Sequence, residues 1–211
     1  AVAYKPNFAF FERWGARGFS WLEDTINYIG AEHILIADAK RGDIGNTAKQ
    51  YAYSIFEHFG FDCVTINPYM GPDSVFPFLG KKEKGVFLLA KTSNASSSYF
   101  QDFRHGKIFL YEKVVEMAKD LNKNDNIGLV VGATAPNELK TIRKLSPGMP
   151  MLIPGVGAQG GDLNSCMRIG NKDGISLINI SRSISFAGDM SSRSIENAAF
   201  NFLNQMHDSL K

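Results

Sequence analysis

The stretch HILIADAKRGD, from His33 to Asp43, decides the fold. Its first part is apolar almost throughout and does not alternate with polar residues, which is typical of a strand buried on both faces of a parallel sheet. Similar runs recur at 1–4, 63–67, 85–90, 127–133, 151–157 and 176–181. Their starts lie roughly 20 to 40 residues apart, which is the spacing of strand–helix–strand units. The chain is therefore predicted to be an α/β protein with a parallel sheet.

Amphipathic segments separate these runs, at 19–30, 46–60, 110–122, 135–146 and 195–210. An open, doubly wound sheet and a closed (β/α)8 barrel (TIM barrel) both fit this alternation. The pattern contains seven strands, and the first residues begin in mid-strand with no preceding turn. We therefore expect a single (β/α)8 barrel domain over residues 1–211. Its first strand, and with it the N-terminal βα unit, is expected to be absent from this chain.

The composition excludes several classes of protein. The 211 residues carry 23 Lys and Arg against 21 Asp and Glu, a net charge of +2, so no excess of basic charge points to nucleic acid. No apolar run reaches the roughly 18–20 residues that cross a bilayer, and the first residues lack the features of a signal peptide. Two cysteines, Cys63 and Cys166, form no disulfide framework. We expect a cytoplasmic protein that binds neither nucleic acid nor membrane.

Polar residues that follow the predicted strands are the candidates for chemistry, because ligands bind at the carboxyl ends of strands in both architectures. Asp38 and Lys40 are two residues apart in one strand, so their side chains share a face. Asp43 follows on the next turn, and Lys5 lies at the same level on the neighbouring strand. Two lysines and two aspartates can therefore alternate around one small volume. The competing interpretation is a solvated turn with one structural ion pair.

A glycine-rich loop, PGVGAQGGD from Pro154 to Asp162, is the second candidate site. Glycine lets backbone N–H groups approach a phosphate closely. Gln159 lies in this loop and Arg182 follows the last strand, and barrel phosphate sites commonly use the loops after the last two strands. The loop does not follow the dinucleotide-binding pattern G-x-G-x-x-G. By itself it fits a mobile lid equally well, but Arg182 beside it favours phosphate binding.

The histidines do not indicate a metal site. His33 precedes its strand, His58 and His207 lie in predicted helices, and His105 lies in a charged loop. None of them is placed as a metal ligand or a general base, and no carboxylate cluster occurs without interposed lysines. The chemistry is therefore expected to depend on lysine and aspartate.

Three segments together resemble the orotidine 5'-phosphate decarboxylase family. They are Lys5-Pro-Asn with AFFE at 9–12, the string DAKRGDIGNT from Asp38 to Thr47, and the loop PGVGAQGGD. The similarity runs in unbroken order from the first residue to at least Arg182. The D-x-K-x-x-D pattern alone is shared with a wider superfamily of barrels, whereas the other strings are more specific. The family begins with a Gly-Leu-Asp-Pro strand that this chain does not contain, which is the same gap that the count of strands indicates.

The resemblance implies a lyase of pyrimidine biosynthesis without metal or cofactor, which converts orotidine 5'-monophosphate to uridine 5'-monophosphate and carbon dioxide. It also implies a (β/α)8 barrel that acts as a homodimer. Lys5, Asp38, Lys40 and Asp43 would form the charged network at the reacting centre, with Lys40 as the proton donor to C6. Asn7 would bind the ribose or base, and Thr92 and Ser93 would lie at the pyrimidine. Gln159 and Arg182 would hold the phosphate, with Pro154, Gly157 and Ser181 beside them. Asp43 and Thr47 would reach into the partner subunit's site.

Three other functions compete with this one. A magnesium-dependent decarboxylase or aldolase of the same superfamily, acting on a sugar phosphate, would hold its metal with an acid where this chain has Lys5. Schiff-base chemistry at Lys40 or Lys5 would require a neutral amine, which the flanking aspartates oppose. A nucleotide-binding barrel that has lost its activity would not need the complete set of lysines and aspartates.

Overall fold

A computed structural model describes all residues, 1–211. The chain divides into two compact units. The first comprises Ala1–Leu89 and Asp120–Ile127, and the second comprises Ala90–Lys119 and Gly128–Lys211.

Parallel strands form the centre of the first unit. Strand β1 pairs with β2, β2 with β3, and β3 with β4. In the register, Ala3 lies opposite Ile34, Ile36 opposite Cys63, and Cys63 opposite Gly85. All the carboxyl ends therefore point the same way. The bounds are β1 Ala3–Tyr4, β2 Ile34–Arg41, β3 Cys63–Ile66 and β4 Gly85–Lys91, the last of which ends in the second unit.

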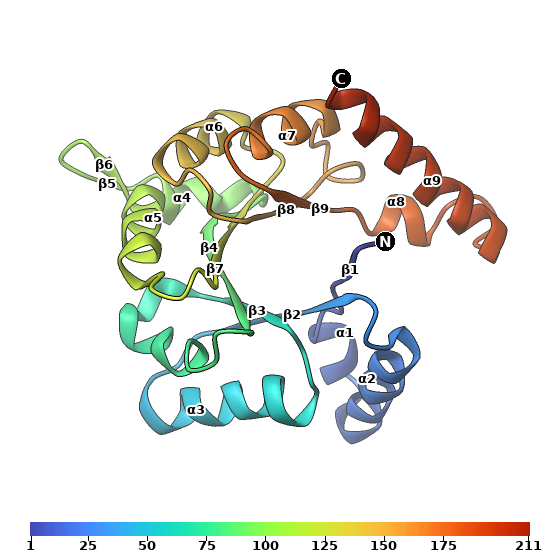
Figure 1. The fold of residues 1–211 in the computed structure, drawn as a ribbon, viewed down its shortest axis with the longest axis horizontal. Helices are drawn as coiled ribbons and strands as arrows, with labels where there is room; N and C mark the ends of the chain where they lie inside the picture. Colours follow the sequence, from blue (N-terminus) through green and yellow to red (C-terminus); the bar gives the residue numbers. More distant parts are fainter. The chain divides into compact units, whose positions relative to one another are not determined.

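The helices of the first unit connect these strands, and α2 and α3 lie on the same side of β2 and β3 (Figure 1). Helices α1 and α2 cross so closely that a Cβ atom at Gly18 would lie 1.8 Å from the carbonyl oxygen of Phe11. Only glycine permits this approach. The bounds are α1 Ala9–Glu12, α2 Gly15–Ile29, α3 Gly45–Tyr53, a π-helical turn at Ser54–His58, and 3-10 turns at Pro68–Met70, Pro72–Ser74 and Phe76–Phe78.

The core of the first unit fills the space between strands and helices. Its fully buried side chains come from β2, β3, α2 and the turns between them, and they include Leu22, Ile36, Ile55, Phe61, Val64 and Phe78. Burying a side chain of this size stabilises a fold by roughly 1.5–3 kcal/mol before conformational entropy is counted. The strands are apolar on both faces because side chains cover both faces, as the sequence predicts.

The second unit repeats the same arrangement. Strand β7 pairs with β8 and β8 with β9, all parallel, and α6 and α7 lie on one side of β8 and β9 (Figure 1). The strands are β7 Ile127–Val131, whose first residue belongs to the first unit, β8 Met151–Pro154 and β9 Ser176–Asn179, with a small hairpin of β5 Arg104–His105 and β6 Ile108–Phe109. The helices are a 3-10 turn at Ala95–Ser97, α4 Ser98–Gln101, α5 Leu110–Leu121, α6 Pro136–Leu145, α7 Leu163–Gly170, α8 Arg182–Ser185 and α9 Ser192–Ser209.

A buried arginine stabilises the loops on the amino-terminal side of these strands. Arg143 in α6 is 3% exposed. Its guanidinium donates hydrogen bonds to four carbonyl oxygens, those of Ser146, Met149, Gly170 and Ile175, at 2.6–3.2 Å. A charge can be buried at this position because the carbonyl oxygens replace the water it loses.

The seven strands and the five longer helices that the sequence predicts are all present. The elements that sequence periodicity did not reveal are short: α7 has eight residues, α1, α4 and α8 have four residues each, and the strands of the hairpin have two. Four residues make about one helical turn, which is too short to show a 3.6-residue period. No helix in the structure combines the length and the apolar character needed to cross a membrane.

Candidate functional site

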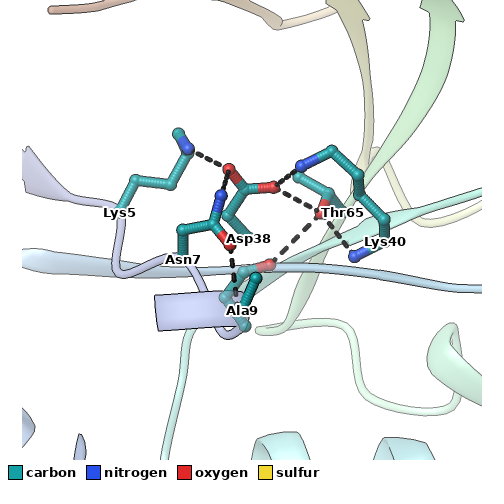
Figure 2. A network of polar contacts seen from close by, with 7 residues as sticks. Lys5, Asn7, Ala9, Asp38, Lys40 and Thr65 are labelled. Carbon is teal, nitrogen blue, oxygen red and sulfur yellow. Dashed lines mark hydrogen bonds and ion pairs between the residues drawn. The ribbon is translucent and has the colours of Figure 1, made fainter. Parts of the chain in front are cut away.

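Asp38 is the centre of a polar cluster at the carboxyl ends of β1 and β2. Its side chain is 9% exposed. Lys5 Nζ forms an ion pair with Asp38 Oδ2, and Lys40 Nζ forms an ion pair with Asp38 Oδ1. Figure 2 shows the two lysines approaching the carboxylate from opposite sides. The structure therefore brings together three of the four charged residues that the sequence placed at one centre.

The backbone after β1 explains how Lys5 and Asn7 reach Asp38. The chain continues alongside β2, since the Asp38 N–H donates to the Pro6 carbonyl at 3.0 Å and the Phe8 N–H donates to the Asp38 carbonyl at 3.3 Å. Asn7 Oδ1 accepts a hydrogen bond from the Ala9 N–H at 3.1 Å, in a local turn that leads into α1. Asn7 Nδ2 lies 3.4 Å from Asp38 Oδ2. Asn7, which the resemblance assigns to the ribose or base, thus borders the charged cluster.

Lys40 has an unusual backbone. Its φ is 45°, in the left-handed region, and the pairing of β2 with β3 shifts register between Ala37 and Arg41. A non-glycine residue in this region costs about 1–2 kcal/mol, so the surrounding contacts must hold it there. One of these contacts is the Lys40 N–H donating to Thr65 Oγ1 at 3.0 Å. Regular alternation along the strand predicted that Asp38 and Lys40 would meet, and they do meet, but across a local irregularity.

Thr65 is a site residue that the sequence reasoning missed. It is 2% exposed, and its hydroxyl lies 3.4 Å from both Asp38 Oδ1 and the Ala37 carbonyl oxygen. The signal was present in the sequence, because Thr65 is the polar residue in the buried strand run CVTI.

Burial and charge act in opposite directions on Lys5 and Asp38. Burial lowers the pKa of Lys5 below its ordinary value, and the attraction of Asp38 offsets only part of this effect. Burial also opposes the ionisation of Asp38. The positive charge of Lys5 and the hydrogen bonds from both lysines outweigh burial and hold the pKa of Asp38 below its ordinary value. Asp38 is therefore ionised at neutral pH.

Asp43 and Thr47 lie apart from this cluster within the chain. Asp43 Oδ1 accepts a hydrogen bond from the Ile44 N–H at 2.8 Å and forms no ion pair with Lys5 or Lys40. Thr47 is exposed on the first turn of α3. The role of both residues in a partner's site stays a prediction.

The glycine-rich loop of the second unit forms a tight turn after β8. The Gly160 N–H donates to the Gly157 carbonyl at 2.8 Å, and the Gly161 N–H donates to the Gly155 carbonyl at 3.0 Å. The carbonyl of Pro154 accepts from the Ala133 N–H at 2.8 Å, which ties the start of the loop to the end of β7. Backbone N–H groups are thus gathered in a loop that has little side-chain bulk.

Gly157 brings the loop against α8. Its φ is 80°, and a Cβ atom at this position would lie 2.5 Å from Ser183 Oγ. The residue before Ser183 is Arg182, which is exposed and forms no ion pair, and Ser181 precedes α8. The loop and the exposed guanidinium of Arg182 therefore lie in neighbouring segments, as the predicted phosphate site requires.

Gln159 and Ser93 meet beside Gly155. A Cβ atom at Gly155 would lie 2.8 Å from Gln159 Oε1 and 3.2 Å from the Cβ atom of Ser93. The predicted phosphate-binding Gln159 and the predicted pyrimidine-binding Ser93 thus border the same loop. Ser93 is held by its carbonyl oxygen, which accepts from Thr134 Oγ1 at 3.1 Å.

The segment after β4 is fixed by the side chains of Gln101 and Asp102, which the sequence reasoning did not select. Gln101 bonds twice to Thr92: its Oε1 accepts from the Thr92 N–H at 2.9 Å, and its Nε2 donates to Thr92 Oγ1 at 2.8 Å. Lys91, which is 3% exposed, pairs with Asp102 at 2.6 Å. Both contacts hold α4 and the residue after it against the end of β4. A lysine at the end of an apolar strand was the available signal.

These features define a class of protein. Parallel strands with connecting helices place a Lys–Asp–Lys cluster and a glycine-rich loop at strand ends, which is where α/β-barrel enzymes build their sites. The thiols take no part, because burial raises the pKa of Cys63 and of Cys166 to about 11. No group of three or more His, Cys, Asp or Glu side chains is arranged to hold a metal ion.

Comparison with known proteins identifies the family. The model of the orotidine 5'-phosphate decarboxylase / HUMPS family matches residues 1–194, and the chain belongs to this family. Orotidine 5'-phosphate decarboxylase of Haloarcula marismortui is 49% identical over 193 residues, which are 90% of this chain and 69% of that protein. The Leishmania donovani OMP decarboxylase structure has a TM-score of 0.92 at 40% identity and covers 99% of this chain and 81% of that one. The likeness confirms the predicted α/β-barrel fold class.

A longer solved protein contains the same fold. The structure of Leishmania donovani UMP synthase has a TM-score of 0.88 at 44% identity. The matched region covers 94% of this chain but 45% of that chain.

Proposed function

We propose that this chain decarboxylates orotidine 5'-monophosphate to uridine 5'-monophosphate in pyrimidine biosynthesis. The observation that carries the proposal is the cluster of Lys5, Asp38 and Lys40, in which one buried carboxylate lies between two ammonium groups. The matching family and the relatives named orotidine 5'-phosphate decarboxylase support it.

The reaction breaks the bond between C6 of the pyrimidine and the carboxylate carbon. The electron pair of that bond stays on C6, carbon dioxide leaves, and a proton from Lys40 Nζ goes to C6. Negative charge on C6 is not delocalised into the ring, so a fixed positive charge beside it lowers the barrier. Lys40 supplies that charge and then the proton, which makes it the proposed catalytic acid.

Asp38 has two proposed effects. It holds both lysines in place, and it presents a negative charge close to the carboxylate that the substrate loses. The two lysines keep Asp38 ionised, so its repulsion is relieved as carbon dioxide departs.

The phosphate of the substrate is the proposed ligand of the glycine-rich loop, Gln159 and Arg182. Arg182 can form two parallel hydrogen bonds to phosphate oxygens. Binding energy from this remote group, together with contacts of Asn7, Thr92 and Ser93, positions the ring at Lys40. Pro154, Gly157 and Ser181 shape the backbone around the phosphate.

The proposed reaction uses neither metal nor cofactor. Lys5 stands where a magnesium-dependent relative would place an acid, and its ammonium group, next to that of Lys40, repels a cation. We also propose that the enzyme is a homodimer in which Asp43 and Thr47 of each subunit reach the other's site.

A spectrophotometric assay that follows the loss of orotate absorbance tests the function directly. We expect turnover of orotidine 5'-monophosphate that is unchanged by EDTA. Lys40→Ala should lower kcat by at least about a hundredfold while affinity for uridine 5'-monophosphate stays within an order of magnitude. Lys49→Ala, at an exposed lysine of α3, is the control and should keep full activity.

Two results would overturn the proposal. Activity that EDTA abolishes and magnesium restores would favour the sugar-phosphate alternative. Comparable turnover by Lys40→Ala would remove the assigned role of the lysine.

A further inference from the structure

Arg41 and Glu12 form a contact that joins the two segments of the charged cluster. Arg41 follows Lys40 in β2, and Glu12 ends α1, the helix that begins just after Asn7. Arg41 Nη2 lies 2.7 Å from Glu12 Oε1. The mechanism proposed above uses neither residue, although both belong to the sequence strings that carry the family resemblance.

The guanidinium of Arg41 is fixed by more than this ion pair. Its Cζ atom lies 5.2 Å from the ring centre of Phe8 and 4.9 Å from that of Tyr51 in α3. The side chain is 21% exposed, and its Nε atom is buried without a hydrogen-bond partner. A planar guanidinium can stack on rings and form an ion pair at the same time, which lysine cannot do equally well. Arg41 therefore connects β2, α1 and α3.

The backbone at this point needs such support. Lys40 is in the left-handed region at φ 45°, a conformation that persists only when its surroundings impose it. On one side, the Lys40 N–H donates to Thr65. On the other side, the carbonyl of Arg41 accepts from the Asn67 N–H at 2.7 Å, and the side chain of Arg41 is anchored as described. Contacts therefore hold the chain both at Lys40 and at the residue after it.

We propose that Arg41 and Glu12 are a positioning pair that keeps Lys40 in its left-handed conformation and keeps Lys5 and Lys40 on opposite oxygens of Asp38. The pair touches neither substrate nor reacting atoms, and it acts through the lysines. The inference rests on the proposed function, because it concerns the placement of the proton donor.

The test compares two glutamates in ion pairs of the same kind. Glu12→Gln breaks the pair with Arg41, and Glu57→Gln breaks the pair between Glu57 and Lys81, which has an N–O distance of 2.6 Å. Both glutamate side chains are 38% exposed. We expect Glu12→Gln to lower kcat about 10- to 100-fold, because a small misplacement of a catalytic group is costly. KM for orotidine 5'-monophosphate should stay within about threefold. Glu57→Gln should change neither constant, and the two variants should unfold at similar temperatures.

Three further variants test the coupling of the pair. Arg41→Gln should lower kcat as Glu12→Gln does, and the double variant should be no slower than the slower single one, because the two residues act as one unit. Arg41→Lys keeps the positive charge but loses the planar guanidinium that stacks on Phe8 and Tyr51. Its kcat should therefore lie between that of Arg41→Gln and that of the unaltered chain. If Arg41→Gln does not fold, the more exposed Glu12→Gln still decides the question.

The possible failures are distinguishable. If the unaltered chain turns over substrate, but kcat of Glu12→Gln lies within twofold of kcat of Glu57→Gln, the positioning role alone is overturned. The positioning role would also be overturned if the fold-losses in kcat of Glu12→Gln and Arg41→Gln multiply in the double variant. An unaltered chain without turnover would overturn the proposed function, and the positioning role with it.

Discussion

Asp38 is the residue on which the other polar groups of the cluster depend. Lys5, Lys40 and Asn7 all direct nitrogen atoms to its carboxylate, and the hydroxyl of Thr65 lies nearby. Removing the negative charge would leave the buried Lys5 ammonium without its counter-ion. Breaking a buried pair in this way destabilises proteins strongly, by about 3–5 kcal/mol in the cases measured.

The pH dependence of stability should reveal this role. The lysines hold the pKa of Asp38 below its ordinary value, so in acid the folded chain binds fewer protons than the unfolded chain. Stabilisation by Asp38 is therefore complete above the unfolded pKa, about 4, and is lost as pH falls through the folded pKa. We expect Asp38→Asn to be less stable than the unaltered chain at pH 7, with a difference that shrinks below about pH 4 in urea unfolding. The exposed Asp24 in α2 is the control, since Asp24→Asn should show no such trend. A difference for Asp38→Asn that stays constant down to pH 3 would contradict this account.

At the scale of elements, the loop after β8 depends on its contact with α8. Gly157 and Gly160 both have positive φ, at 80° and 84°. A Cβ at Gly157 would meet Ser183, whereas a Cβ at Gly160 would meet nothing within 4 Å. Substitutions at the two glycines can therefore be compared to separate the effect of a steric clash with Ser183 from the effect of backbone strain.

Alanine at these two positions should have unequal effects on substrate binding. Gly157→Ala must displace α8 or the loop, so we expect KM to rise by roughly tenfold or more, because phosphate contacts supply binding energy. Gly160→Ala adds only strain and should raise KM less. Steady-state kinetics with orotidine 5'-monophosphate measure both. Equal KM values for the two variants would show that the approach to Ser183 does not matter.

The end of β4 is a second element whose contacts can be tested. Asp102 follows α4 and pairs with Lys91, whose side chain is 4% exposed against 30% for Asp102. Asp102→Ala leaves a buried ammonium without a partner, and we expect a loss of about 3 kcal/mol in the free energy of unfolding. Lys91→Met removes the charge and fills the space, so it should cost less, and the double variant should be more stable than Asp102→Ala. Urea unfolding measures all three. The explanation fails if Asp102→Ala is the more stable single variant.

At the scale of the whole molecule, the chain places its two kinds of chemistry in two units. The Lys–Asp–Lys cluster belongs to the first unit and the glycine-rich loop with Arg182 to the second. The near-neutral total charge conceals this organisation, because the two lysines and one aspartate of the cluster are a small part of 23 basic and 21 acidic residues. That residues 1–211 act as one domain stays a prediction.

Mixing two inactive variants tests the proposed dimer. In the proposed dimer, each site combines Lys40 of one subunit with Asp43 of the other. A dimer of one Lys40→Ala subunit and one Asp43→Asn subunit therefore has one site with both changes and one site with neither. Random exchange makes about half of the dimers mixed, so roughly a quarter of the unaltered activity should return. Activity measured after unfolding and refolding the mixture is the readout, and each variant treated alone is the control. No gain over the separate variants would contradict a shared site.

The sequence was sufficient for the parts of the molecule that follow simple periodicities. Apolar runs located every long strand, and polar residues after them located Lys5, Asp38 and Lys40. It did not reveal that Lys40 is left-handed, because the contacts around it are tertiary: the Lys40 N–H donates to Thr65 Oγ1, and the neighbouring Arg41 guanidinium lies over the ring of Phe8. Gln101 and Asp102 were missed for a similar reason, since their contacts depend on a four-residue helix that has no visible period.

The close crossing of α1 and α2 makes an uncharged residue, Gly18, relevant to the proposed site. Any side chain at Gly18 must push Phe11 away, and Phe11 belongs to the helix that follows Lys5 and Asn7. We therefore expect a side chain at this buried, apolar position to disturb the segment that carries Lys5, the lysine proposed for the charged network. In a genetic screen for loss of pyrimidine prototrophy, Gly18 should appear among the damaging sites, beside the lysines themselves.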